Sequence, residues 1–64
     1  MLKGIKDFKN LIELDLSSNR IASNIEELTS LIYLKKLNLS FNSVQELSIL
    51  PPNLENLNLS NNMI

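Results

Sequence analysis

One spaced pattern occurs three times in this chain of 64 residues and constrains its fold more than any other feature. The pattern is Leu-x-x-Leu-x-Leu-x-x-Asn-x, followed by Ile or Val. Its three copies are Leu11, Leu14, Leu16, Asn19 and Ile21; Leu34, Leu37, Leu39, Asn42 and Val44; and Leu54, Leu57, Leu59, Asn62 and Ile64. Five matching positions in every copy are not expected by chance, so the sequence predicts a stack of similar structural units.

The spacing of the copies defines the units within a single domain. The first leucines, Leu11, Leu34 and Leu54, are separated by 23 and then by 20 residues. We therefore expect a repeat at 11–33, a repeat at 34–53 and an incomplete repeat at 54–64, about 2.5 repeats in all.

The residues before the first copy also show a spaced apolar pattern. It recurs at every third residue through Leu2, Ile5, Phe8 and Leu11. This spacing is how the returning half of a repeat presents its inward side chains. We therefore interpret 1–10 as the tail of a preceding repeat, and the whole chain as a piece of a longer array.

The alternation of leucine with polar residues inside each copy is typical of a short strand. Stacking would place strands centred on 13–16, 36–39 and 56–59 side by side in a parallel sheet. Leu14, Leu37 and Leu57 would then form one buried column. Because parallel strands in one sheet are connected with right-handed crossovers, the expected fold is a right-handed α/β solenoid with its sheet on the concave face.

The two connections between strands have different compositions. In the first, Ser23 and Asn24 precede Glu26 and Glu27 by three residues, which predicts capping boxes and a short helix or 3₁₀ turn over about 24–33. The second is three residues shorter and contains two prolines in succession, at 51 and 52. Since proline disfavours helix, we expect at most one turn near 45–48 and then extended chain.

The asparagine of each copy follows the strand, where the chain must turn sharply. Backbone groups in such a turn would be buried without partners, and a side-chain amide supplies both a donor and an acceptor. We therefore expect Asn19, Asn42 and Asn62 to form a structural ladder between adjacent repeats.

These motifs resemble the leucine-rich-repeat superfamily over the whole chain from residue 2 to 64. Residues 11–33 look like the 22-residue class of intracellular phosphatase-regulating and splicing-associated proteins, with one extra residue near Ser23. Residues 34–53, which contain Leu50-Pro51-Pro52-Asn53, resemble the 20-residue class of secreted bacterial effectors. The resemblance implies a surface that recognises proteins through its concave strand face.

The alternation of the strand identifies which side chains such a face would present. Positions three, five, seven and eight of each copy project from the sheet. The candidate partner-binding residues among them are Glu13, Asp15, Lys36, Asn38, Phe41, Asn56 and Asn58. Phe41 is the candidate anchor because interface energy concentrates in a few large side chains, although its ring could instead lean on the neighbouring turn. Glu13 and Lys36 should form a cross-strand ion pair.

The composition excludes several functions. With no His, no Cys and one glycine, the chain offers no catalytic dyad, metal site or phosphate-binding loop, so we expect no enzymatic activity and no cofactor. The net charge of −1 gives no reason to expect nucleic acid or a membrane surface as a partner. The absence of cysteine and of an apolar leader favours a reducing compartment such as the cytoplasm.

Three functions fit these observations. The first is a protein–protein interaction module or a fragment of one. The second is the substrate-recognition segment of a larger enzyme, such as an effector-type ubiquitin ligase. The third is a structural spacer that associates end to end with other copies, because the open ends of a repeat stack expose apolar side chains and strand backbone.

Overall fold

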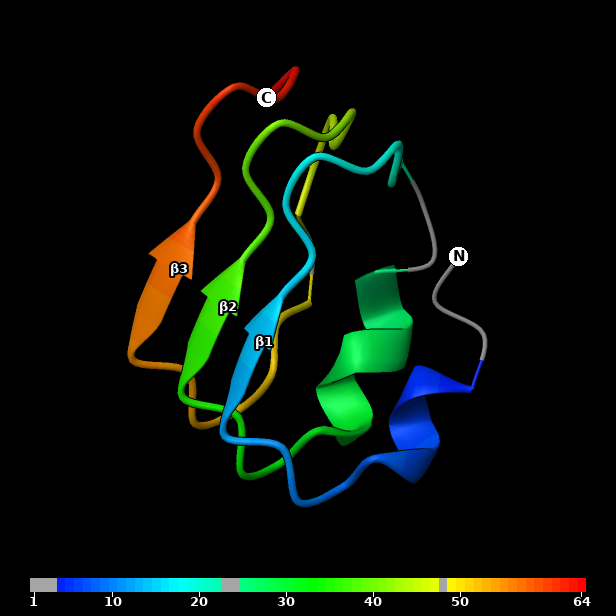
Figure 1. Ribbon diagram of the computed structural model, residues 1–64, viewed down its shortest axis with the longest axis vertical. Helices are drawn as coiled ribbons and strands as arrows, with labels where there is room; N and C mark the ends of the chain where they lie inside the picture. Colours follow the sequence, from blue (N-terminus) through cyan, green and yellow to red (C-terminus); the bar gives the residue numbers. More distant parts are fainter. Residues whose placement is uncertain (1–3, 23–24, 48) are drawn as a thin grey trace.

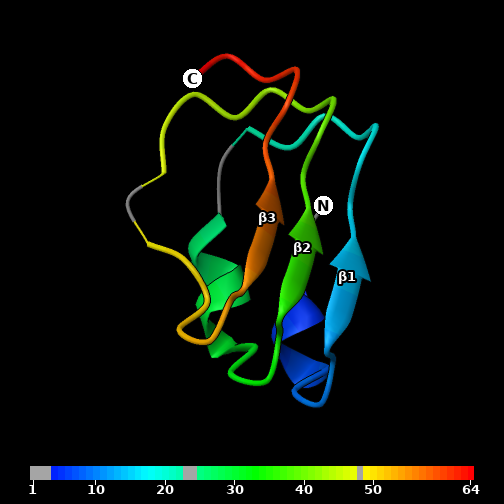
Figure 2. The same ribbon diagram turned by 90° about the vertical axis from the view of Figure 1, so that its left-hand side faces the viewer.

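The computed structural model describes residues 4–22, 25–47 and 49–64. Its elements are the 3₁₀ segment η1 (Ile5–Asp7), strand β1 (Glu13–Asp15), the 3₁₀ segment η2 (Ile25–Ser30), strand β2 (Lys36–Asn38) and strand β3 (Asn56–Asn58). The strands form one layer, and both 3₁₀ segments lie in a second layer behind it (Figure 1). Turned by 90°, the same molecule shows the three strands running in one direction (Figure 2).

The sheet has the order β1-β2-β3, and both pairings are parallel, as the alternation predicted. Each strand is one residue shorter at its end than expected. Leu14, Leu37 and Leu57 are in register, but only Leu37 is buried, with 2% of its surface exposed. The expectation of a fully buried column is therefore wrong at both ends, because β1 and β3 each have a neighbouring strand on one side only.

The hydrophobic core lies between the sheet and η2 and is shared equally by residues 11–33 and 34–53. Ile25 and Leu28 of η2 pack there with residues from the flanking segments, and the other buried members are Ile21, Leu31, Leu34, Leu37, Leu39 and Val44. The predicted short helical segment is confirmed as a 3₁₀ segment, while the capping residues Ser23 and Asn24 fall outside the described residues. The core is therefore formed where the segments 11–33 and 34–53 stack on each other, as expected for an array in which each unit contacts its neighbours.

The second connection passes behind the sheet without helix among its described residues, 45–47 and 49–53. Pro51 is buried and Pro52 begins a turn that leads into β3. The proline pair thus has the predicted effect, because proline removes a backbone donor and restricts the residue before it.

At the amino-terminal end, η1 packs beside η2. Ile5 and Leu11 are half-buried against the core, which matches the every-third-residue pattern, whereas Phe8 is 61% exposed. The expectation that Phe8 points inward is therefore wrong, because Phe8 follows the last residue of η1 and its backbone, with φ −92° and ψ 59°, leaves the helical conformation. Leu2 lies outside the described residues.

The same backbone hydrogen bonds join repeat one to repeat two and repeat two to repeat three. The N–H of Leu16 donates to the carbonyl of Asn38 at 2.8 Å, and the N–H of Leu39 donates to the carbonyl of Asn58 at the same distance. Past the strand, Ser18 donates to the carbonyl of Ser40 at 3.0 Å. The backbone pairing therefore continues past the strands into the turns. It does so at both interfaces, although the motif copies are 23 residues apart at the first and 20 at the second.

The asparagines hold these turns by bonding back to the preceding repeat. Asn42 Nδ2 donates to the carbonyl of Leu16 at 2.9 Å, and Asn42 Oδ1 accepts the N–H of Ile21 at 3.0 Å. Within its own repeat Asn42 Nδ2 also donates to the carbonyls of Leu39 and Ser40, at 2.9 and 3.1 Å.

The other two asparagines make related but unequal sets of bonds. Asn62 repeats the set, with Nδ2 on the carbonyl of Leu39 at 2.9 Å and Oδ1 on the N–H of Val44 at 2.9 Å. Asn19 donates to the carbonyls of Leu16 and Ser17, both in its own turn.

We predict that Asn42→Ala lowers the free energy of unfolding by about 1–3 kcal/mol, because it strips partners from buried backbone groups. Asn62→Ala should cost less, since its partners are closer to water, and Asn19→Ala least, since its bonds join no second repeat. Urea unfolding followed by circular dichroism measures the three differences. An Asn19→Ala loss equal to that of Asn42→Ala would show that bonds between repeats do not stabilise the turns.

Candidate protein-interaction surface

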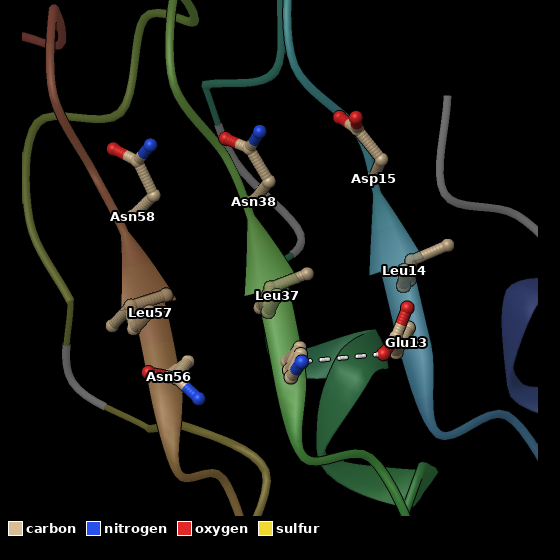
Figure 3. Close-up of a pocket in the computed structure, with 9 residues that line it drawn as sticks. Glu13, Leu14, Asp15, Leu37, Asn38, Asn56, Leu57 and Asn58 are labelled. Atoms are coloured by element: carbon tan, nitrogen blue, oxygen red, sulfur yellow. Dashed lines mark ion pairs between the residues drawn. The ribbon is translucent and has the colours of Figure 1, made fainter.

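The strands present two rows of polar side chains on the face of the sheet that looks away from η1 and η2. One row runs across β1, β2 and β3 as Glu13, Lys36 and Asn56, and the second as Asp15, Asn38 and Asn58. We call these six residues the strand face. They line a shallow, open depression over the sheet (Figure 3). Six of the seven candidate binding residues thus come together, and Phe41 lies beyond the end of β2.

Glu13 and Lys36 form the predicted cross-strand ion pair. Lys36 Nζ lies 3.5 Å from Glu13 Oε1, and the two side chains are 60% and 67% exposed. An exposed pair of this kind contributes only about 0–1 kcal/mol, so its main effect is to balance charge on the face.

Each side chain of the second row closes a turn with the serine two residues ahead. Asn38 Oδ1 accepts the backbone N–H of Ser40 at 3.0 Å and its hydroxyl at 2.7 Å. Asn58 Oδ1 accepts the same two groups of Ser60, at 3.0 and 2.8 Å. Such side-chain bonds to the following backbone are a common way for Asn and Asp to build turns, and here they hold the row rigidly.

Asp15 makes the equivalent turn on β1. The N–H of Ser17 donates to Asp15 Oδ1 at 2.9 Å. The hydroxyl of Ser17, and then its backbone N–H, lower the pKa of Asp15 below its ordinary value of 3.8, against a smaller opposing effect of burial. The carboxylate therefore stays charged throughout the neutral range.

The serines at position seven take part in the turns and differ in how far they are exposed. Ser17 is half-buried, Ser40 is buried and Ser60 is exposed. The expectation that position seven projects from the face is therefore wrong for Ser40, because its hydroxyl turns back to Asn38.

Position eight follows the strand in a left-handed backbone conformation in every repeat. The φ angles of Ser18, Phe41 and Asn61 are 59°, 56° and 59°. Asn tolerates this region, whereas a bulky aromatic residue rarely occupies it. Asn61 alone is a residue type that favours a left-handed turn at this position. Because the central copy has Phe41 there, the sequence did not predict the left-handed conformation.

Phe41 is held in this strained conformation and still exposes 59% of its surface. Its N–H donates to the carbonyl of Ser60 at 3.0 Å. The same φ at Asn61, which has no following repeat in the described structure, indicates that the turn itself sets the backbone angle. The ring does not enter the core.

The described residues contain no cluster of His, Cys, Asp or Glu that could hold a metal ion. Neither 3₁₀ segment has the length or apolar character that a membrane-crossing helix requires.

The comparisons with known proteins agree with this geometry. A family model described as Leucine Rich repeats (2 copies) matches residues 9–52. The chain belongs to the leucine-rich-repeat family. The resemblance seen in the spaced leucines and asparagines is therefore confirmed.

Two curated relatives of this leucine-rich-repeat chain have the same printed name, Acidic leucine-rich nuclear phosphoprotein 32 family member A. The protein of Drosophila melanogaster is 44% identical over 66 residues, which cover 95% of this chain and 25% of the relative. That of Drosophila pseudoobscura pseudoobscura is 45% identical over 51 residues, which cover 80% of this chain and 19% of the relative. The chain thus spans at most a quarter of these proteins. No solved structure matches it.

We predict that Asp15 titrates below its ordinary pKa and that Ser17→Ala raises its pKa towards that value, because the hydroxyl donor is lost. A carboxyl group whose pKa is lowered by folding stabilises the folded state above its unfolded pKa. This contribution is lost as the pH falls through the lower, folded pKa. NMR titration of the carboxyl carbon measures the shift, with Ser30→Ala as a control that touches no bond of Asp15. An unchanged titration in Ser17→Ala would contradict the assignment.

We predict that Phe41→Asn raises the free energy of unfolding by about 1 kcal/mol, because asparagine tolerates the left-handed conformation that costs phenylalanine energy. The reciprocal change at the equivalent position, Asn61→Phe, should lower it by a similar amount. Thermal and urea unfolding of the two variants provide the measurement. A Phe41→Asn variant that is less stable than the parent would show that the ring contributes more packing than its backbone angle costs.

Proposed function

We propose that this leucine-rich-repeat chain is a protein–protein interaction module, or part of one, and that it binds its partner through the strand face together with Phe41. The observation that carries the proposal is the pair of ordered polar rows that no described segment of the chain covers. Turn hydrogen bonds hold the second row in place before any partner arrives, which lowers the entropy cost of binding.

The exposure and backbone conformation of Phe41 also support a binding role for this surface. An exposed aromatic side chain in a strained backbone conformation is not explained by stability. Strain of this kind persists where the surrounding structure enforces it and is found at functional sites. A large exposed ring beside a polar face is also the kind of anchor on which binding energy concentrates.

The proposal also includes the number of repeats, the handedness of the solenoid and the side on which its strands lie. We infer that the chain forms about 2.5 repeats of a right-handed solenoid whose strands lie on the concave side, so that a partner would contact several repeats at once. Since the relatives are four or more times longer, the whole protein to which such a module belongs would carry further surfaces and activities.

The names of the two relatives help to choose between an interaction module and the substrate-recognition segment of an enzyme. Both are named as leucine-rich nuclear phosphoproteins, which favours an interaction module over the recognition segment of a secreted ubiquitin ligase. The nucleus is a reducing compartment, in keeping with a chain without cysteine. We therefore propose a nuclear protein as the partner. End-to-end association of copies remains a separate prediction that light scattering across a concentration series would test.

Photo-crosslinking tests the interaction surface. Benzoylphenylalanine placed at Phe41 should cross-link to a discrete protein in nuclear extract, because this ring lies at the proposed contact. Mass spectrometry of the product identifies the partner, and competition by unlabelled chain shows that the contact is specific.

Tyr33 provides the matched control. It is 55% exposed, close to the value for Phe41, but it lies in the turn before β2 and away from the end of the sheet that carries Phe41. Benzoylphenylalanine at Tyr33 should not cross-link the same protein. Equal or stronger cross-linking from Tyr33 would contradict the proposed surface.

A further inference from the structure

The leucines of the three motif copies are buried to different degrees. In the central copy, Leu34, Leu37 and Leu39 expose 0%, 2% and 0% of their surface. The equivalent leucines at the two ends of the stack are only partly buried, and they are Leu11, Leu14 and Leu16 in the first copy and Leu54, Leu57 and Leu59 in the third. Each end therefore presents three leucines with the spacing that the central copy buries between two neighbours.

The two ends also carry complementary hydrogen-bonding groups. Within the stack, Asn42 Oδ1 accepts the N–H of Ile21 in the repeat before it. Asn19 has the position of Asn42 in the first repeat, but within the described residues its Oδ1 accepts no hydrogen bond. Ile64 has the position of Ile21 in the third repeat, and within the same residues its N–H has no acceptor. The first repeat thus offers the acceptor that the third repeat lacks.

The described structure contains one strand without a returning segment and one returning segment without a strand. A returning segment is the stretch that leads from the end of one strand to the start of the next. η2 belongs to the returning segment after β1, and the second connection is the one after β2 (Figure 1). Among the described residues no segment of this kind lies behind β3, whereas η1 packs beside η2 and follows no described strand. The two ends would together make up one repeat.

We propose that the chain associates head to tail with a second copy of itself, so that β1 of the second copy pairs in parallel with β3 and extends the sheet. Asn19 of the second copy would accept the N–H of Ile64 and donate to the carbonyl of Leu59. Asn62 makes the same two bonds to the central repeat inside the stack. This inference concerns the ends of the stack and leaves the strand face uncovered, so it does not depend on the proposed function.

The register of the sheet fixes which side chains would meet across the contact. β2 pairs with β3 position by position, and β1 of a second copy has the same motif positions as β2. Glu13 of the second copy would therefore lie beside Asn56, and Asp15 beside Asn58. Both carboxylates would meet uncharged side chains, so no like charges oppose the association.

A second copy fits these ends better than other occupants. An unrelated strand could pair with the backbone of β3, but it would not supply three leucines and an asparagine at the motif spacing. Two β3 edges placed together by a two-fold axis would run antiparallel and leave the N–H of Ile64 without Asn19. Because the head-to-tail contact joins two different surfaces, it does not close unless the copies form a ring, and open oligomers are expected.

Sedimentation equilibrium from micromolar to millimolar concentration tests the association. We expect the average mass to rise continuously with concentration, as it does for a contact that does not close. Circular dichroism at the same concentrations should show that the strands are retained. A strict monomer at millimolar concentration, or a dimer that grows no further, would overturn the inference.

Single cysteines test the direction and the register of the contact, since the chain has no cysteine of its own. Glu13→Cys and Asn56→Cys are mixed in equal amounts in a glutathione buffer. Head-to-tail stacking places these positions on adjacent strands, about 4.8 Å apart and within reach of a disulfide, whereas equal positions of two copies lie about 14 Å apart. The mixed disulfide should exceed the two homodimers together by about fivefold or more.

The control mixture replaces Glu13→Cys with Gln45→Cys, at an exposed residue of the central repeat. It should pair at random, with as much mixed disulfide as both homodimers together. Random pairing in the mixture of Glu13→Cys and Asn56→Cys would overturn the inference.

A charge placed on β3 tests the same contact without a covalent bond. Within its own copy Asn56→Glu lies beside Lys36, so the fold should be retained. Across the contact it would meet Glu13 of the second copy, and we expect this repulsion to raise the dissociation constant about threefold or more. Gln45→Glu makes the same charge change in the central repeat and should leave the dissociation constant unchanged. Equal effects of the two variants would overturn the inference.

Discussion

The turns that follow β1 and β2 each depend on an asparagine supplied by the next repeat. Asn42 donates to the carbonyl of Leu16, which also accepts from Asn19, and it accepts the N–H of Ile21, for which it is the partner in the turn. Since Asn62 does the same for the central repeat, each repeat is completed by the one after it. The stability of the chain therefore rests on the contacts between repeats, as expected for a stacked array.

This dependence explains how repeats of unequal length stack in register. The hydrogen bonds between β1 and β2 recur between β2 and β3, although the first leucines of the three motif copies are 23 and then 20 residues apart. The difference is absorbed behind the sheet, where η2 occupies the longer connection and extended chain with Pro51 occupies the shorter one. The connecting segments can vary because they fill the core from behind without entering the ladder of bonds.

The same turn geometry shapes the candidate interaction surface. The bonds of the turn impose a left-handed conformation on position eight, which suits Asn61 and conflicts with Phe41. They also orient Asn38 and Asn58 so that oxygen faces the turn and nitrogen faces outward. A sequence that is locally consistent elsewhere departs from local preference at Phe41, and such departures are expected where function constrains a residue.

The sequence alone determined the family, the parallel sheet, its register and the positions of the strand-face residues, because these follow from periodicity and from the alternation of a strand. It also determined that the described residues of the second connection, 45–47 and 49–53, contain no helix, since proline acts locally. Only the tertiary structure decided the burial of Leu14, Phe8 and Ser40, which depends on what lies beside each residue. The outward amides of the second row and the strained backbone of Phe41 depend on the geometry of a single turn. The direction of the bonds that Asn42 and Asn62 make depends on contacts between repeats. Those contacts join residues about 20 positions apart, which a pattern read along the chain cannot orient.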